Sequence, residues 1–163
     1  MTSHEQSFDA VYRAHAPTVF RRARKLLGSD ADAQDVVSDV FTSLYERPEQ
    51  YAGRSALATF LYSMTTHACL NQIRNQRRRA RLHEAGREAI AVGPQHSSAP
   101  DRAAQLRELL LRMPEPLGQV AVYYYLDELT HAEIAELLGC SRRHVGDLLE
   151  RLGSWMQARE RCA

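Results

Sequence analysis

Apolar residues recur at helical spacing along most of the chain, which predicts an all-α protein. The first apolar stripe runs over residues 8–27 and is interrupted by Pro17, so we expect a break or kink near Ala16. A second stripe covers residues 31–46 and includes Val36 and Val40. A third begins after Ser55 and continues into a long helix.

The segment 130–152 predicts two short helices joined by a tight turn. Thr130 and Glu133 have the spacing of a capping box, and Gly139 suits the left-handed conformation that ends a helix. Ser141 then caps a second helix. This is the spacing of a helix-turn-helix, whose second helix can lie in the DNA major groove, although a plain helical hairpin has the same pattern.

Residues 85–100 separate the two halves of the chain. They are rich in glycine, proline and serine and lack apolar periodicity, which predicts a flexible linker. We therefore expect two small helical domains, residues 5–84 and residues 101–161, the second being a four-helix module. Within that module Tyr124 and Tyr125 are available for the core, and Trp155 is also expected there.

Charge is distributed unevenly, although the formal net charge is only +1. Asp32, Asp35 and Asp39 recur at spacings of three and four on the helix 31–46, where they form either a solvated face or a docking surface for a basic partner. The long helix after Ser55 ends in an arginine run that has no acid before Glu84. A solubilising helix end would need only one or two arginines, so the run favours phosphate binding.

Composition argues against several classes of protein. Cys69, Cys140 and Cys162 lie far apart, which suggests neither a disulfide framework nor a zinc site and fits a reducing cytoplasm. No apolar run approaches the roughly 20 residues that cross a bilayer, so no membrane insertion is expected. No histidine lies near the acidic helix positions and no metal-binding motif is present. We therefore expect no catalytic residue, metal or cofactor, and a metal-dependent nuclease is the weaker alternative.

The whole ordered set resembles a known family. An acidic helix (DADAQDVVSDVFTSLYE), a turn, an arginine-ending helix (FLYSMTTHACLNQIRNQRRR), a linker and a helix-turn-helix are similar to the bacterial RNA polymerase sigma factors of the extracytoplasmic-function (ECF) type, in the sigma-70 family. The resemblance covers the chain from Phe8 to Arg159. It implies a cytoplasmic transcription initiation factor, not an enzyme, that binds core RNA polymerase, directs it to specific promoters and assists promoter melting. The two domains would be sigma regions 2 and 4.

The resemblance also implies residue roles. The acidic helix would dock on core polymerase through Asp32, Asp35, Val36, Asp39 and Val40. The turn and the long helix would open and read the minus-ten element as melted single strand, through Arg54, Ser55, Thr66, His67, Asn71, Arg74, Arg77 and Arg78. The helix-turn-helix would read the minus-thirty-five element in duplex DNA through Ser141, Arg142, Arg143, His144, Asp147 and Arg151. An anti-sigma protein is implied as a further partner.

The chain departs from the family pattern in two places, residues 146–147 and residue 60. Gly146 and Asp147 stand where many members have a lysine or arginine and a serine, and Phe60 stands where tryptophan is usual. Because acids on a groove-facing surface repel phosphates, we expect the second domain alone to bind DNA weakly. The alternative is a helix-turn-helix regulator that acts without polymerase, which would require tight duplex binding by the isolated protein.

Overall fold

The structure is a computed structural model that describes residues 3–53, 55–84 and 102–161. None of these residues lies in a strand, so the predicted all-α class is confirmed. The chain divides into two compact units, unit 1 (Met1–Val92) and unit 2 (Gly93–Ala163). The predicted linker over residues 85–100 lies outside the described residues.

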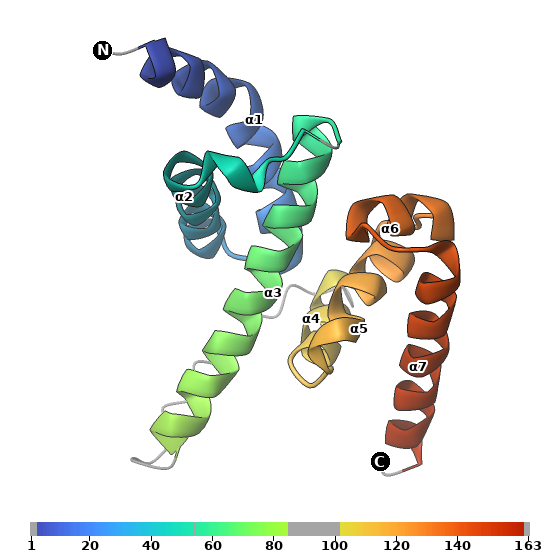
Figure 1. The fold of residues 1–163 in the computed structure, drawn as a ribbon. Coiled ribbons are helices and arrows are strands. Elements are labelled where there is room, and N and C mark those ends of the chain that lie inside the picture. Colours follow the sequence, from blue (N-terminus) through green and yellow to red (C-terminus); the bar gives the residue numbers. More distant parts are fainter. Residues whose placement is uncertain (1–2, 54, 85–101, 162–163) are drawn as a thin grey trace. The chain divides into compact units, whose positions relative to one another are not determined.

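In the described part of unit 1, three α-helices all contact one another (Figure 1). They are α1 (Ser3–Leu27), α2 (Asp30–Glu46) and α3 (Leu57–Glu84), with the short 3₁₀ helix η1 (Pro48–Gln50) after α2. Ser29 caps α2, since its hydroxyl accepts a hydrogen bond from the Asp32 N–H at 3.3 Å. The buried apolar side chains come from all three helices: Val19, Ala23, Leu26, Ala33, Val36, Val37, Val40, Phe41, Leu44, Leu61, Leu70 and Ile73.

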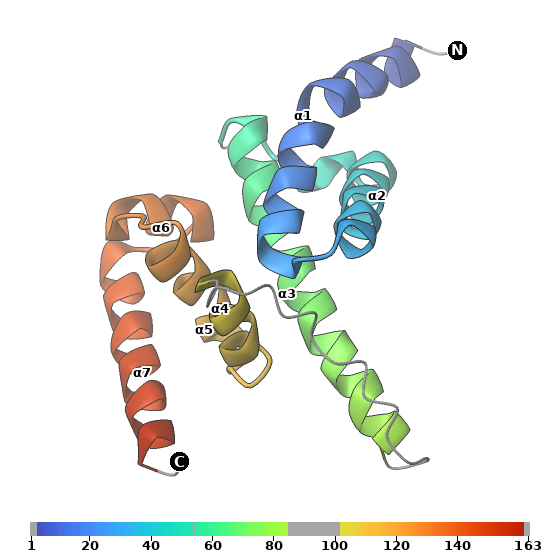
Figure 2. The same ribbon diagram turned by 180° about the vertical axis from the view of Figure 1, so that it is seen from behind.

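Helix α1 continues through Pro17, so the expected break near Ala16 is absent. Its ribbon nevertheless changes direction part of the way along, which is the kink that an internal proline produces (Figures 1 and 2). Edge-to-face aromatic contacts hold the first half of α1 against α2. The ring centroids of Phe8 and Tyr45 are 5.0 Å apart, and those of Tyr12 and Phe41 are 4.8 Å apart.

A buried polar contact joins α1 to α3. Arg22 is only 7% exposed and donates to the hydroxyl of Thr66 from Nε at 3.3 Å and from Nη2 at 3.1 Å. Its guanidinium also lies 4.1 Å from the ring centroid of Tyr62. The Thr66 hydroxyl in turn donates to the Tyr62 carbonyl at 2.9 Å. These directional contacts fix one side of α3 against α1.

Unit 2 is the predicted four-helix module. It consists of α4 (Arg102–Leu110), α5 (Glu115–Ala121) continued by the π-helical stretch η2 (Val122–Leu126), α6 (His131–Leu138) and α7 (Arg142–Glu160). Helix α7 contacts both α5 and α6. The buried apolar residues of this unit are Leu110, Met113, Leu117, Val120, Ala121, Val122, Tyr123, Ile134, Ala135, Val145, Leu148 and Leu152.

The π-helical stretch changes which tyrosines are buried. The Asp127 N–H donates to the Val122 carbonyl five residues earlier, at 3.1 Å, so this turn is wider than an α-helical one. As a result Tyr123 is fully buried, whereas Tyr124 and Tyr125 are 39% and 50% exposed. The prediction that Tyr124 and Tyr125 belong to the core was wrong, because it assumed an unbroken α-helical period. Trp155, also predicted in the core, is only half-buried.

Candidate nucleic-acid and protein interfaces

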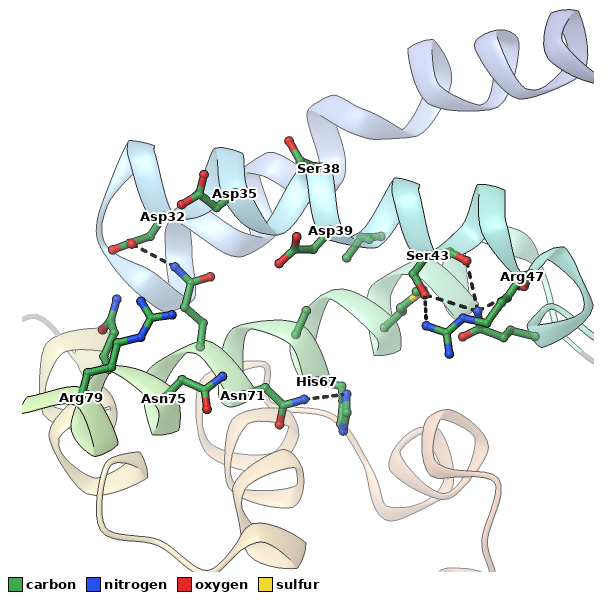
Figure 3. A pocket seen from close by; sticks show the side chains of 16 residues that line it. Asp32, Asp35, Ser38, Asp39, Ser43, Arg47, His67, Asn71, Asn75 and Arg79 are labelled. Atoms are coloured by element: carbon green, nitrogen blue, oxygen red, sulfur yellow. Dashed lines mark hydrogen bonds between the residues drawn. The ribbon is translucent and has the colours of Figure 1, made fainter. Parts of the chain in front are cut away.

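A polar groove of about 710 Å³ lies between α2 and α3 in unit 1 (Figure 3). Helix α2 contributes Asp32, Asp35, Ser38 and Asp39 to it. Helix α3 contributes a facing row of amide, imidazole and guanidinium side chains: His67, Asn71, Gln72, Asn75, Gln76 and Arg79. An anionic wall therefore stands opposite a wall of hydrogen-bond donors and acceptors.

The three predicted acids share the groove side of α2. Asp35 and Asp39 are exposed, and within the described residues neither makes an ion pair or a side-chain hydrogen bond. Asp32 is half-buried and accepts a hydrogen bond from Gln72 Nε2 at 2.9 Å. Asp32 thus helps to join α2 to α3, while Asp35 and Asp39 expose negative charge that no described residue neutralises.

Two predicted polymerase contacts on α2 are corrected by their burial. Val36 and Val40 are each 1% exposed and belong to the core of unit 1. The helical period turns them inward while it turns Asp35 and Asp39 outward. Their side chains therefore pack the core, with Val40 also lining the groove, and the acids supply the exposed charge of that predicted set.

One face of α3 carries a chain of polar contacts. Arg74 Nη1 donates to Asn71 Oδ1 at 3.2 Å, and Asn71 Nδ2 lies 3.3 Å from Nδ1 of the exposed His67. The three residues are spaced by four and three positions, so they follow one face of the helix. Their contacts limit the rotamers of Asn71, which leaves a preorganised row of groups suited to hydrogen bonding with bases.

Thr66, also predicted to contact DNA, is a second correction. It is fully buried, and its hydroxyl is engaged by Arg22 and by the Tyr62 carbonyl. It therefore positions α3 and offers no atom to a ligand. Ser55 is half-buried, and its carbonyl accepts a hydrogen bond from the Tyr51 hydroxyl at 2.7 Å. Arg54 and the side chains of Arg77 and Arg78 lie outside the described residues.

Asn75 and Gln76 are groove residues that the sequence analysis missed. The signal was available, because His67, Asn71, Asn75 and Arg79 recur every four residues and so share one helical face. The exposed Arg79 places a cation at one end of this row. The row extends about three turns along α3.

In unit 2 local capping sets the helix-turn-helix. The Thr130 N–H and hydroxyl donate to the Glu133 carboxylate at 2.8 and 2.6 Å, and the Glu133 N–H donates back to the Thr130 hydroxyl at 3.3 Å. The hydrogen bonds from Thr130 lower the pKa of Glu133. Gly139 ends α6 with φ of 63°, and the Ser141 hydroxyl caps α7 by accepting from the His144 N–H at 3.2 Å. The predicted capping box, helix end and second cap are all present.

Helix α7 begins with a cationic, exposed surface. Val145, Leu148 and Leu152 are buried, whereas the residues predicted to contact duplex DNA are exposed: Ser141, Arg142, Arg143, His144, Asp147 and Arg151. None of these side chains is in an ion pair within the part of the chain that the structure describes. The first turn of α7 therefore offers Arg142, Arg143 and the positive end of the helix dipole to an anionic partner.

The next features are the candidate metal ligands and the two cysteines in the described part of the chain. Among the described residues, no group of three or more histidine, cysteine, aspartate or glutamate side chains is placed to hold a metal ion. Burial raises the pKa of Cys69 to about 12 and also raises that of the half-buried Cys140, so both thiols are protonated at neutral pH. In the described part of the chain no helix combines the length and apolar character needed to span a membrane.

Comparison with known proteins finds matches to both units. Residues 11–79 match the family model for sigma-70 region 2, and residues 103–151 match that for sigma-70 region 4. The chain is 26% identical over 157 residues to the RNA polymerase sigma factor YlaC of Bacillus subtilis, with 91% of this chain and 88% of that protein covered. It is 23% identical over 146 residues to the ECF RNA polymerase sigma factor SigW of the same organism, with 82% and 78% covered.

A solved structure shares the fold. The sigma factor RpoE of Bartonella quintana, crystallised with the anti-sigma factor NepR, superposes with a TM-score of 0.53 at 16% sequence identity. The similarity covers 94% of this chain and 96% of that one. At this level of identity the likeness concerns the fold.

Proposed function

The chain belongs to the sigma-70 family of bacterial RNA polymerase sigma factors, in the ECF group, and we propose from this how its two units divide the work of transcription initiation. It is an initiation factor that directs core RNA polymerase to promoters and assists their melting. A polymerase-independent regulator is not favoured. We take residues 5–84 as region 2 and residues 101–161 as region 4, acting in the cytoplasm without a catalytic group of their own.

The observation that carries the proposal is the separation of charge across the groove of unit 1. Asp35 and Asp39 form an exposed anionic surface on α2, and we assign it to a basic surface of core polymerase, with Asp32 at its edge. Because these acids have no partner among the described residues, binding does not require an internal ion pair to break. Long-range attraction would also speed the encounter with polymerase.

The opposite wall of the groove supports contact with the minus-ten element. His67 and Asn71 present donors and acceptors on this wall, and Arg79 adds a cation for the phosphate backbone. Arg74, which does not line the groove, donates to Asn71 from beside it. We retain Arg54, Ser55, Arg77 and Arg78 as proposed flanking contacts. Melting needs no reacting group, since the cost of unstacking, a few kcal/mol per base, is offset by binding the exposed strand.

The first two turns of α7 support contact with the minus-thirty-five element in duplex DNA. Arg142, Arg143 and His144 are exposed at the helix N-terminus, and Arg151 is exposed further along. In a helix-turn-helix the N-terminal residues of the second helix meet the base edges. Ser141 acts through its cap on the His144 N–H, which frees the rest of the first turn for DNA.

An anti-sigma protein is a further proposed partner. The similar RpoE fold is seen in complex with the anti-sigma factor NepR. In this chain such a regulator would compete best by covering Asp35 and Asp39 or the N-terminus of α7, because these surfaces are exposed. Either contact would block one of the two proposed interfaces.

Charge reversal on α2 tests the polymerase assignment. The double variant Asp35→Lys/Asp39→Lys should lose core polymerase affinity by on the order of tenfold or more, measured by titration of labelled polymerase with the full chain. Binding to a single-stranded minus-ten oligonucleotide should be retained. The matched control is Glu46→Lys/Glu49→Lys, which makes the same charge change at exposed positions outside the groove. Equal losses in the two variants would show that overall charge, not the groove acids, governs binding.

A further inference from the structure

The outward side of α7 carries both positive and negative side chains. DNA binding by this helix does not by itself explain the negative ones. Since Val145, Leu148 and Leu152 are buried, the opposite side of the helix carries Arg143, Asp147 and Glu150, at positions i, i+4 and i+7. All three are exposed. Two acids therefore lie on the surface that would enter a groove bordered by phosphates.

No described residue neutralises Asp147. No ion pair or hydrogen bond of its side chain occurs among the described residues, even though Arg143 stands one turn earlier at the spacing that allows a pair. Next to it, Gly146 has no neighbouring atom within 4 Å of where a Cβ would stand. The helix thus carries no side chain at Gly146, which permits close approach of its backbone to DNA.

We propose that Asp147 determines promoter specificity, by accepting a hydrogen bond from the exocyclic amino group of a cytosine in the minus-thirty-five duplex, beside a guanine read by Arg143. The inference rests on the proposed role of unit 2 in duplex recognition. A carboxylate in the major groove is repelled by phosphates unless a base donates to it. The arginine-to-guanine contact is the commonest specific pairing in that groove.

Base chemistry selects cytosine over the other bases. In the major groove cytosine presents its amino group as a donor with no acceptor on its own edge. Adenine also presents an amino group, but its N7 acceptor lies beside it and repels a carboxylate. Guanine and thymine present acceptors only, together with the thymine methyl group. Asp147 should therefore exclude these bases as well as favour cytosine.

Glu150 has the same charge and a different position. It lies about one turn further from the N-terminus of α7, whereas base contacts in a helix-turn-helix come from the N-terminal residues. Its carboxylate should lower DNA affinity uniformly and read no base. Glu150→Gln is therefore a matched control for changes at Asp147, because both remove one negative charge from the same stripe.

The test uses the full chain with core RNA polymerase on a promoter library whose minus-thirty-five element is randomised, with transcripts sequenced. The wild type should enrich cytosine at one position next to a guanine. Asp147→Ala should reduce that preference by about fivefold or more and leave the other positions unchanged. Asp147→Asn should shift the preference at that position to adenine, because asparagine bonds adenine N6 and N7 together. Glu150→Gln should raise activity on all sequences without changing the preference.

Other results would overturn the inference. If Asp147→Ala behaves as Glu150→Gln does, Asp147 contributes only repulsion. If Asp147→Ala and Asp147→Asn both abolish transcription on every sequence, its role is structural. If the wild type transcribes selectively but enriches no cytosine, Asp147 reads no base, and the proposed function still stands. If the wild type does not support transcription from any member of the library, the proposed function itself fails.

Discussion

The two units distribute charge in opposite ways. Around its groove, unit 1 places three acids on α2 and hydrogen-bond donors with the cation Arg79 on α3. Unit 2 places both signs of charge on the outward side of one helix, α7. Two separate walls suit the two partners that we propose for unit 1, whereas a mixed face suits one. In these proposals the acids of unit 1 attract a basic partner, and Asp147 on α7 discriminates between bases.

The interiors of the two units also differ, in whether they contain buried polar side chains. The buried polar side chains among the described residues are Arg22, Thr65 and Thr66, all of which lie in unit 1. There a directional contact between α1 and α3 sets which side of α3 faces the groove. The helix-turn-helix of unit 2 instead relies on an apolar core and on caps at its helix ends. Polar positioning in unit 1 and apolar packing in unit 2 can be tested separately.

The largest effect is expected from Leu152→Ala in unit 2. Leu152 is fully buried on α7, so truncation should cost about 3 kcal/mol of unfolding free energy through lost burial and a residual cavity. Urea unfolding followed by Trp155 fluorescence measures this unit, because Trp155 is the only tryptophan and lies in α7. Equal destabilisation of unit 1 would contradict the independence of the two cores.

Arg22→Ala should have the next largest effect, in unit 1. It removes two hydrogen bonds to Thr66 and the contact with the Tyr62 ring, for a loss of roughly 2 kcal/mol. The rate of thiol labelling at Cys69 measures this unit, because Cys69 is fully buried with its pKa raised to about 12 by burial. Cys140 and Cys162 would first be replaced by serine.

A second variant and a control measurement test the Arg22 prediction further. Thr66→Val removes the acceptor alone and should cost less, about 1 kcal/mol, since the ring contact remains. The Trp155 transition should be unchanged in both variants. If Arg22→Ala leaves Cys69 labelling as slow as in the wild type, the polar contact does not hold α1 to α3.

Helix ends could be predicted from the sequence because their chemistry is local. Thr130, Gly139 and Ser141 act on backbone groups within a few residues of themselves, and each lies at the helix end that the sequence indicated. The α7 residues that the resemblance assigned to DNA are exposed for a different reason. The regular apolar period of this helix buries Val145, Leu148 and Leu152 and leaves those residues outward.

The failures involve information from far along the chain or a change of helical period. Thr66 looked like a surface donor, but its partner Arg22 lies 44 residues earlier. Val36 and Val40 are an exception, because the resemblance assigned them to a polymerase contact although their own apolar stripe already placed them in the core. The exposure of Tyr124 and Tyr125 depends on a π-helical stretch, and the spacing of apolar residues in the sequence does not predict such a stretch.

A smaller effect, a gain in stability where the substitutions above cause losses, is expected at the end of the π-helical stretch η2. Glu128 has φ of 56°, the left-handed conformation that suits glycine, and the following Leu129 N–H donates to the Tyr123 carbonyl at 3.0 Å. Glu128→Gly should stabilise unit 2 by about 1 kcal/mol, measured from the Trp155 transition. Glu128→Ala also removes the charge but keeps the unfavourable Cβ. Equal gains in both variants would assign the effect to charge rather than to backbone conformation.

The smallest effect is a pH dependence confined to unit 2. Hydrogen bonds from Thr130 hold the pKa of Glu133 below its ordinary value of 4.5. Since the unfolded chain then binds this proton more readily, the stabilisation is complete above pH 4.5 and is lost as pH falls through the lower folded-state pKa. The stability advantage of the wild type over Glu133→Gln should therefore shrink in the Trp155 transition as the solution is acidified, and Cys69 labelling should not follow it. Glu136→Gln, an exposed position on the same helix, is the control. If the stability advantage over Glu136→Gln shrinks in the same way, the effect comes from net charge and not from the capping box. The stability of the helix-turn-helix would then depend on packing alone.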